Sequence, residues 1–196
     1  SVRLNGSAAD VAAAAALCER TAVELRPLLG DWLFAEGTKE VPQLVLDRLC
    51  AEGRSIAFAE SCTGGLCAAR LTDLPGSSEV LQGGVVAYSN AAKHELLGVP
   101  GQLIEQHGAV SEQVAAAMAV GAMQRFQSDC AVATTGIAGP AGGTEQKPVG
   151  MVCFAIATRD ASGSTDAKAW TVKIADLGRT FVRDRAVYEV WRALLV

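Results

Sequence analysis

Histidine is scarce in this 196-residue chain, which contains only His94 and His107. Two imidazoles are too few for most histidine-based metal sites, and they leave little choice for the histidine of a Ser-His-Asp triad. Neither histidine lies in a glycine-rich loop or beside a potential ligand partner, so we interpret both as structural. We therefore expect no metal and no cofactor, and any catalytic site must be built from other residue types.

The chain also lacks an excess of charge of one sign. Seventeen basic residues stand against 21 acidic ones, which gives a net charge of −4 with no long block of either sign. Such a surface does not attract a nucleic-acid backbone or an anionic membrane, so we expect neither partner. No segment reaches the roughly 20 uninterrupted apolar residues of a spanning helix. The alanine-rich stretch 11–17 has no basic leader, and we expect a cytoplasmic protein.

A metal-binding or disulfide framework is absent as well, because no two cysteines form a C-x-x-C pair. The cysteines are dispersed, mostly among apolar neighbours, and we interpret them as buried free thiols. Half of the residues are apolar and 19% are charged, a composition that excludes a disordered chain. The six cysteines are Cys18, Cys50, Cys62, Cys67, Cys130 and Cys153.

Helical periodicity alternates with short apolar runs along the chain, which predicts an α/β fold with helices on both faces of a sheet. Two adjacent strands near the end imply an antiparallel pair. We predict a three-layer α/β/α sandwich with a mixed, mostly parallel sheet over residues 39–196, preceded by an N-terminal helical extension at 1–38. The predicted strands are 55–59, 84–88, 129–134, 149–158 and 167–174; the predicted helices are 10–29, 41–52, 66–71, a short one ending at 97, 101–107, 112–126 and a closing helix through 187–194.

A glycine-rich loop, Glu-Ser-Cys-Thr-Gly-Gly at 60–65, follows the first predicted strand. It places the hydroxyls of Ser61 and Thr63 and the amides of Gly64 and Gly65 at the start of a helix. Free N–H groups and the helix dipole there favour an anion or a developing oxyanion. The loop predicts a phosphate cradle or a nucleophile elbow, and a tight turn with a capping hydroxyl is an equal alternative.

A second glycine-rich loop, 134–144, follows the third predicted strand. Ligands of open α/β sheets collect beyond the carboxyl ends of the strands, so both loops indicate a site at one sheet edge. Tyr88 and Lys93, drawn from only two tyrosines and five lysines, follow the second strand and can project toward that edge. A hydroxyl nucleophile such as Ser61 needs a base, and a lysine kept neutral by burial and nearby positive charge is available. A solvated helix lysine is the plainer interpretation of Lys93, and Glu60 either orients Lys93 or a substrate hydroxyl or caps the first helical turn.

Six sequence motifs in a fixed order carry a family resemblance. Over about residues 41–190 the chain resembles the CinA C-terminal domain, the group of nicotinamide mononucleotide amidohydrolases, also called deamidases. The resemblance implies a three-layer α/β/α domain that hydrolyses the carboxamide of nicotinamide mononucleotide to nicotinic acid mononucleotide and ammonia without a metal. The motifs are AESCTGG (59–65), LTDLPGSS (71–78), GGVVAYSN (83–90) with Lys93, GAVSE (108–112), TGIAGP (135–140) and KPVG (147–150).

The same resemblance assigns roles to individual residues. Ser61 is similar to the family's nucleophile, Lys93 to its general base, and Tyr88 to a partner that organises or relays protons between them. Thr135 corresponds to a substrate or oxyanion contact. Arg179 matches the arginine of a Gly-Asp-Arg motif, although residues 177–180 read Leu-Gly-Arg-Thr and lack the aspartate. The full set of expected substrate contacts is Glu60, Thr63, Gly64, Gly65, Asn90, Thr135, Gly136, Gly139, Gly142, Gly143 and Arg179.

Two functions remain open from the sequence. The first is an amidohydrolase whose small-molecule partner is nicotinamide mononucleotide, in a chain that is compatible with a homo-oligomer. The second is a catalytically silent nucleotide-binding or regulatory relative. Retention of Ser61, Tyr88 and Lys93 favours the enzyme, because a binding pocket alone does not require a hydroxyl, a phenol and an amine around one point.

Overall fold

A computed structural model describes residues 2–30, 33, 36–37, 39–160 and 162–195. The chain divides into two compact units at 38/39. The N-terminal unit contains helix α1 (Val11–Leu29), which begins where the sequence predicts because the Asp10 carboxylate accepts a hydrogen bond from the Ala13 amide at 2.8 Å. None of the residues of α1 is buried within the described structure. Among the described residues, no helix combines the length and the apolarity that crossing a membrane requires.

A five-stranded sheet forms the centre of the second unit, in the order β2-β1-β3-β4-β5. β1 pairs in parallel with β2 and β3, whereas β3–β4 and β4–β5 are antiparallel, so β4 alone runs against the other four strands. The predicted mixed, mostly parallel sheet is therefore confirmed. The strands are β1 (Ile56–Glu60), β2 (Leu81–Val86), β3 (Cys130–Gly136), β4 (Met151–Arg159) and β5 (Thr165–Lys173).

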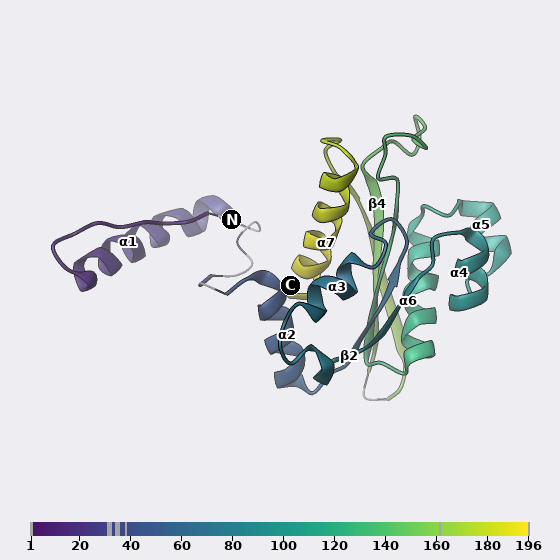
Figure 1. Cartoon of the computed structure of the whole chain (residues 1–196), viewed down its shortest axis with the longest axis horizontal. Helices are drawn as coiled ribbons and strands as arrows, with labels where there is room; N and C mark the ends of the chain where they lie inside the picture. The colour runs from purple at the N-terminus through teal and green to yellow at the C-terminus, as the bar shows by residue number, and fades with distance from the viewer. Residues whose placement is uncertain (1, 31–32, 34–35, 38, 161, 196) are drawn as a thin grey trace. The chain divides into compact units, whose positions relative to one another are not determined.

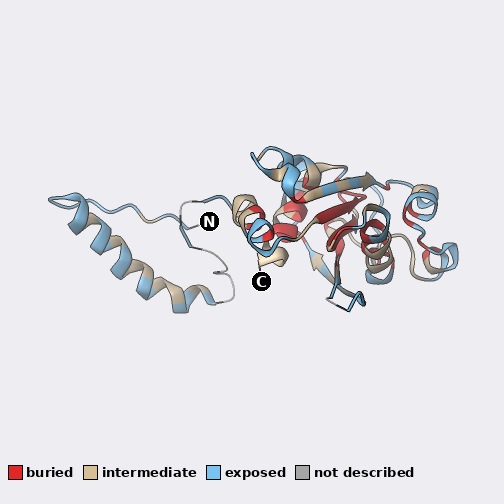
Figure 2. Cartoon of the chain, turned by 90° about the horizontal axis from the view of Figure 1, so that it is seen from below, coloured by how far each residue is buried: buried red, intermediate tan, exposed pale blue. Residues whose placement is uncertain are grey.

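Helices cover both faces of this sheet, as the sequence predicts (Figure 1). Strand β1 shows how the layers arise, because Ile56 and Phe58 contribute to one apolar core and Ala57 and Ala59 to the other. Figure 2 shows the buried residues concentrated on the strands and on the helix sides that face them. One face carries α2 (Val41–Glu52), α3 (Leu66–Thr72) and α7 (Arg179–Leu195); the other carries α4 (Asn90–Leu97), α5 (Gly101–His107) and α6 (Glu112–Phe126); a short 3-10 helix, η2 (Ser77–Glu79), precedes β2.

Strand β2 differs from its prediction at both ends. It begins at Leu81 rather than residue 84 and ends at Val86, so Tyr88 lies beyond the strand. Two glycines in this strand interrupt the apolar pattern by which a strand is predicted, so the sequence places its start too late. At Gly83 the backbone leaves room for the Phe126 ring, since a Cβ atom there would lie 2.4 Å from Phe126 Cε1.

The prediction of buried free thiols is correct for four of the six cysteines. Cys62, Cys67, Cys130 and Cys153 are buried, and all six are unpaired. Cys50 is the exception, because it follows the core residue Leu49 on α2 and faces solvent; the sixth, Cys18, is half-buried.

Gly121 allows α6 to pass close to the end of α4. A Cβ atom at this position would lie 1.9 Å from the Leu97 carbonyl oxygen, which is backbone and cannot rotate away. Because α4 carries Lys93, this close approach also fixes the height of that lysine above the sheet.

We predict that Gly121→Ala lowers the free energy of unfolding by about 2 kcal/mol in urea denaturation. Overpacking costs about 1–3 kcal/mol, and the better helix propensity of alanine, worth about 1 kcal/mol, offsets only part of it. The matched control is Gly101→Ala at the start of α5, where no atom lies within 4 Å of the added methyl group. Equal stability of the two variants would contradict the close contact.

Candidate active site

The carboxylate of Glu60 joins the end of β1 to the beginning of α3. It accepts hydrogen bonds from the amides of Gly65 (2.9 Å), Cys67 (3.1 Å) and Ala68 (2.9 Å), and the side chain is 2% exposed. These are amides that a helix N-terminus leaves without an intrahelical partner. Of the roles considered for Glu60, capping is the one that the structure shows, since both carboxylate oxygens accept from main-chain amides of α3 and the turn before it.

This capping corrects the expectation that the amides of Gly64 and Gly65 receive an anion. The Gly64 amide donates to the Ser61 carbonyl at 3.1 Å and the Leu66 amide to the Thr63 carbonyl at 3.4 Å. Together with the three amides bound by Glu60, every amide from 64 to 68 already has an acceptor. Gly64 and Gly65, with φ of 63° and 93°, serve the turn itself rather than a ligand.

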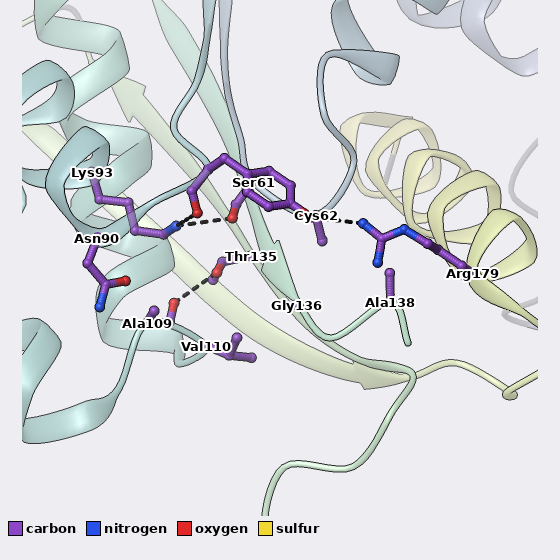
Figure 3. Close-up of a pocket in the computed structure, with 11 residues that line it drawn as sticks. Ser61, Cys62, Asn90, Lys93, Ala109, Val110, Thr135, Gly136, Ala138 and Arg179 are labelled. Atoms are coloured by element: carbon purple, nitrogen blue, oxygen red, sulfur yellow. Dashed lines mark hydrogen bonds between the residues drawn. The ribbon is translucent and has the colours of Figure 1, made fainter. Parts of the chain in front are cut away.

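Ser61 and Lys93 meet at the carboxyl edge of the sheet (Figure 3). Lys93 is 1% exposed, and its Nζ lies 3.0 Å from Ser61 Oγ. The same nitrogen donates to the carbonyls of Ala87 (2.9 Å) and Tyr88 (3.3 Å). A neutral amine has two N–H donors and one lone pair. With both donors on carbonyls, the lone pair is free to face the serine hydroxyl.

Burial lowers the pKa of Lys93 below that of an ordinary lysine, because the ammonium loses its hydration. None of the ion pairs in the described part of the chain includes Lys93, so no carboxylate opposes this effect. The sequence also led us to expect that nearby positive charge keeps this lysine neutral, and Arg179 is a cationic residue that lines the same pocket. The Arg179 guanidinium instead donates to the Gly139 carbonyl and the Tyr88 hydroxyl, each at 2.8 Å, and the lowered pKa is due to burial.

Tyr88 does not stand between the nucleophile and the base. Its side chain is 59% exposed and its hydroxyl accepts from Arg179, while only its carbonyl faces Lys93. Because β2 ends at Val86, the ring of Tyr88 is placed by the following loop. Lys93 contacts Ser61 directly, which leaves no gap for a phenol to bridge.

Seven of the predicted site residues share one pocket of about 170 Å³. They come from both glycine-rich loops, from the segment between β2 and α4, from α4 and from α7 (Figure 3). Four lining residues were not predicted, although Ala109 and Val110 lie within the quoted motif at 108–112. The predicted lining residues are Ser61, Tyr88, Asn90, Lys93, Thr135, Gly136 and Arg179; the additional ones are Cys62, Ala109, Val110 and Ala138.

Seven other predicted contacts lie outside the lining of this pocket. Besides Glu60, Gly64 and Gly65, these include Thr63, which is fully buried with its hydroxyl 2.7 Å from that of Thr134. The remaining three are glycines of the second loop. A Cβ atom at Gly139 would lie 2.6 Å from the Val149 side chain, and one at Gly143 would lie 2.9 Å from the Val149 amide. These two glycines let the loop pack on itself, and Gly142 lies in the same loop with a φ of 91°.

Side chains around the pocket hold its wall in place. The Thr135 hydroxyl donates to the Ala109 carbonyl at 2.8 Å. Lys147, whose role was not predicted, donates to the carbonyls of His107 (2.6 Å) and Val110 (2.7 Å). Both interactions fix the loop 107–110 that faces Ser61 across the pocket. The described residues contain no cluster of three or more histidine, cysteine or acidic side chains placed to hold a metal ion.

The sequence matches one protein family over most of its length. Residues 38–195 match the family model of the CinA C-terminal domain. The chain belongs to the CinA family. A CinA-like protein of Mycolicibacterium paratuberculosis is 57% identical over 162 residues, which cover 83% of this chain. The chain spans only 37% of the length of that relative.

Solved structures of the CinA superfamily share the fold. The competence/damage inducible protein CihA of Agrobacterium tumefaciens is 38% identical, with a TM-score of 0.71 over 82% of this chain and 98% of that one. A CinA superfamily protein of Escherichia coli is 30% identical, with a TM-score of 0.71 over 85% of this chain and 97% of that one. The α/β architecture is therefore that of the CinA superfamily.

We predict that Glu60→Gln lowers the free energy of unfolding by about 1–3 kcal/mol. The amide has one acceptor oxygen where the carboxylate has two, and its NH₂ group faces buried N–H donors. Urea denaturation measures the loss. Glu105→Gln, at an exposed position of α5, is the control and should leave stability unchanged. A Glu60 variant as stable as the Glu105 variant would show that the cap contributes little.

Proposed function

We propose that this protein hydrolyses the carboxamide of nicotinamide mononucleotide to nicotinic acid mononucleotide and ammonia. The observation that carries the proposal is the buried Lys93 amine at 3.0 Å from the Ser61 hydroxyl, in a pocket open to a small molecule. Membership of the CinA family supports it, through the resemblance of the motifs to amidohydrolases. A buried lysine without an ion-pair partner is expensive to keep in a fold, which favours a chemical role over a structural one.

In the first half of the proposed reaction, Ser61 Oγ attacks the carboxamide carbon while Lys93 Nζ takes the hydroxyl proton. The carbonyl oxygen becomes an oxyanion in a tetrahedral intermediate. When the C–N bond breaks, the Lys93 ammonium returns its proton to the departing nitrogen, which leaves as ammonia. Ser61 then holds the nicotinoyl group as an ester.

In the second half, Lys93 accepts a proton from water as the water oxygen attacks the ester carbon. The C–O bond to Ser61 breaks, and Lys93 gives the proton back to Ser61 Oγ. One amide and one water are consumed, and one acid and one ammonia are formed. The carbonyls of Ala87 and Tyr88 hold the amine in the same place through both halves.

The size of the pocket indicates which end of the substrate enters it. Pockets that enclose drug-sized ligands are about 300–1,000 Å³, and this pocket is about 170 Å³. We infer that the pyridine carboxamide enters and that the ribose phosphate lies at its mouth. Arg179 begins α7 there, so the helix N-terminus and the guanidinium favour a phosphate.

We predict that the purified protein releases ammonia from nicotinamide mononucleotide and that Ser61→Ala abolishes the release. Loss of a nucleophile commonly lowers kcat by several orders of magnitude. The phosphate-free riboside should react with lower kcat/KM, because it forgoes the contacts at α7. The measurement is a coupled ammonia assay with both compounds, together with calorimetric binding.

The same experiment separates the two candidate functions. A protein that binds nicotinamide mononucleotide without releasing ammonia would be the silent binding relative. Near-normal ammonia release by Ser61→Ala would exclude Ser61 as the nucleophile. Equal kcat/KM for riboside and mononucleotide would exclude the phosphate contact and leave the chemistry at Ser61 intact.

We predict that kcat/KM rises with pH through the ionisation of Lys93, because only the neutral amine can accept the Ser61 proton. An ordinary lysine has a pKa of about 10.4, and the lowered value places the midpoint of the rise below that pH. Lys93→Arg should be inactive at every pH, since a guanidinium stays protonated. A pH profile of both proteins tests this, and substantial activity in Lys93→Arg would exclude the general base.

A further inference from the structure

Arg183 of α7 donates hydrogen bonds to the turn that carries Ser61. Its Nε donates to the Cys62 carbonyl at 3.2 Å and its Nη2 to the Thr63 carbonyl at 2.8 Å. The contact is close, because a Cβ atom on Gly64 would lie 3.3 Å from Arg183 Nη2. Arg183 is outside the lining of the pocket, so it does not reach a ligand there.

The two carbonyls determine where the intervening amide points. The Cys62–Thr63 peptide is trans, and a planar trans peptide directs its N–H opposite to its C=O. With the Cys62 carbonyl turned toward α7, the Thr63 N–H is turned away from α7. Among the described residues, neither this amide nor that of Cys62 donates to an oxygen acceptor.

The pocket lining shows where this part of the turn lies. Cys62 itself lines the pocket beside Ser61. The two residues that directly follow Ser61 therefore carry N–H donors without an oxygen acceptor, whereas the amides from 64 to 68 already have acceptors.

We infer that Arg183 is a positioning residue that holds the Cys62 and Thr63 amides as the oxyanion-binding donors of the Ser61 site. Preorganised N–H donors contribute most when they need not rotate during the reaction. A fork of two guanidinium N–H groups fixes two successive carbonyls, and therefore a peptide plane, in a way that a single ammonium cannot. The inference rests on the proposed serine chemistry and not on the identity of the substrate.

The test uses Arg183→Ala and Arg183→Lys, with Arg185→Ala as the matched control. Arg185 lies on the same helix and pairs with Glu189 at 2.9 Å, away from the turn. Loss of one oxyanion donor lowers kcat by about 10²–10³-fold, so a loosened pair should lower it by about 10- to 100-fold. KM should change little, since Arg183 does not line the pocket. Arg183→Lys keeps the charge and one contact, and its kcat should fall between those of the wild type and Arg183→Ala.

A second readout is independent of nicotinamide mononucleotide. An alkyl fluorophosphonate forms an Oγ–P bond with an activated serine while the P–F bond breaks, fluoride leaves and Lys93 takes the proton. Its phosphoryl oxygen needs the same donors as a carbonyl oxyanion. Intact-mass spectrometry should show slower labelling of both Arg183 variants than of Arg185→Ala, and no labelling of Ser61→Ala.

The outcomes are distinct. Labelling at Ser61 without ammonia release would reject the proposed substrate and leave the inference to be decided by the labelling rates. Wild-type labelling rates in both Arg183 variants would overturn the inference. The inference would also be overturned if the labelling rate fell in proportion to the loss of thermal stability, and to the same extent in the Arg183 and Arg185 variants. Arg183 would then act only through the stability of the fold.

Discussion

The buried carboxylate of Glu60 is the interaction on which the site depends. It ends β1, caps α3 and confines Ser61 to the short turn between them. Without it, the amides at the start of α3 would be desolvated and unpaired, at a cost of about 1–3 kcal/mol for each buried donor. The position of the serine hydroxyl therefore follows from a polar contact inside the fold and not from any ligand.

Lys93, the proposed base, is also held by contacts inside the fold. Lys93 reaches Ser61 from α4, with its amine fixed by two main-chain carbonyls. The closeness of α4 to α6 at Gly121 supports this reach. Ser61 follows a strand of the sheet and Lys93 belongs to a helix packed on it, so the distance between them is a property of the packing between layers.

Much of the fold could be predicted from the sequence, because long apolar periodicity determines it. The helix after Asp10, the helix after Ser111 and the buried strand β1 all begin within a residue of their predicted positions. Strand β2 was harder, since the role of Gly83 is visible only when Phe126 is packed against it. Ser61 and Lys93 were identified from chemical scarcity and family resemblance, and both lie in the pocket.

The contacts between residues distant in sequence could not be predicted. Capping of the first turn of α3 was one of the roles that the sequence left open for Glu60, but the sequence did not decide between them. Nothing in residues 60–65 reveals that Arg183, some 120 positions later, donates to the carbonyls of the turn. Glycines in the second loop were assigned to the substrate through the family resemblance. In the structure, Gly139 and Gly143 are required by close packing on Val149.

The occupied start of α3 also separates two kinds of protein that share one backbone design. A strand, a glycine turn and a helix make a phosphate-binding loop when the helix amides are vacant. Here the chain supplies its own anion, in the form of a covalently attached carboxylate that cannot diffuse away. The Glu60 carboxylate already accepts from these amides, so free phosphate or sulfate would have to displace it in order to bind them. A compound designed to bind the start of α3 through an anionic group would therefore have to displace the Glu60 carboxylate.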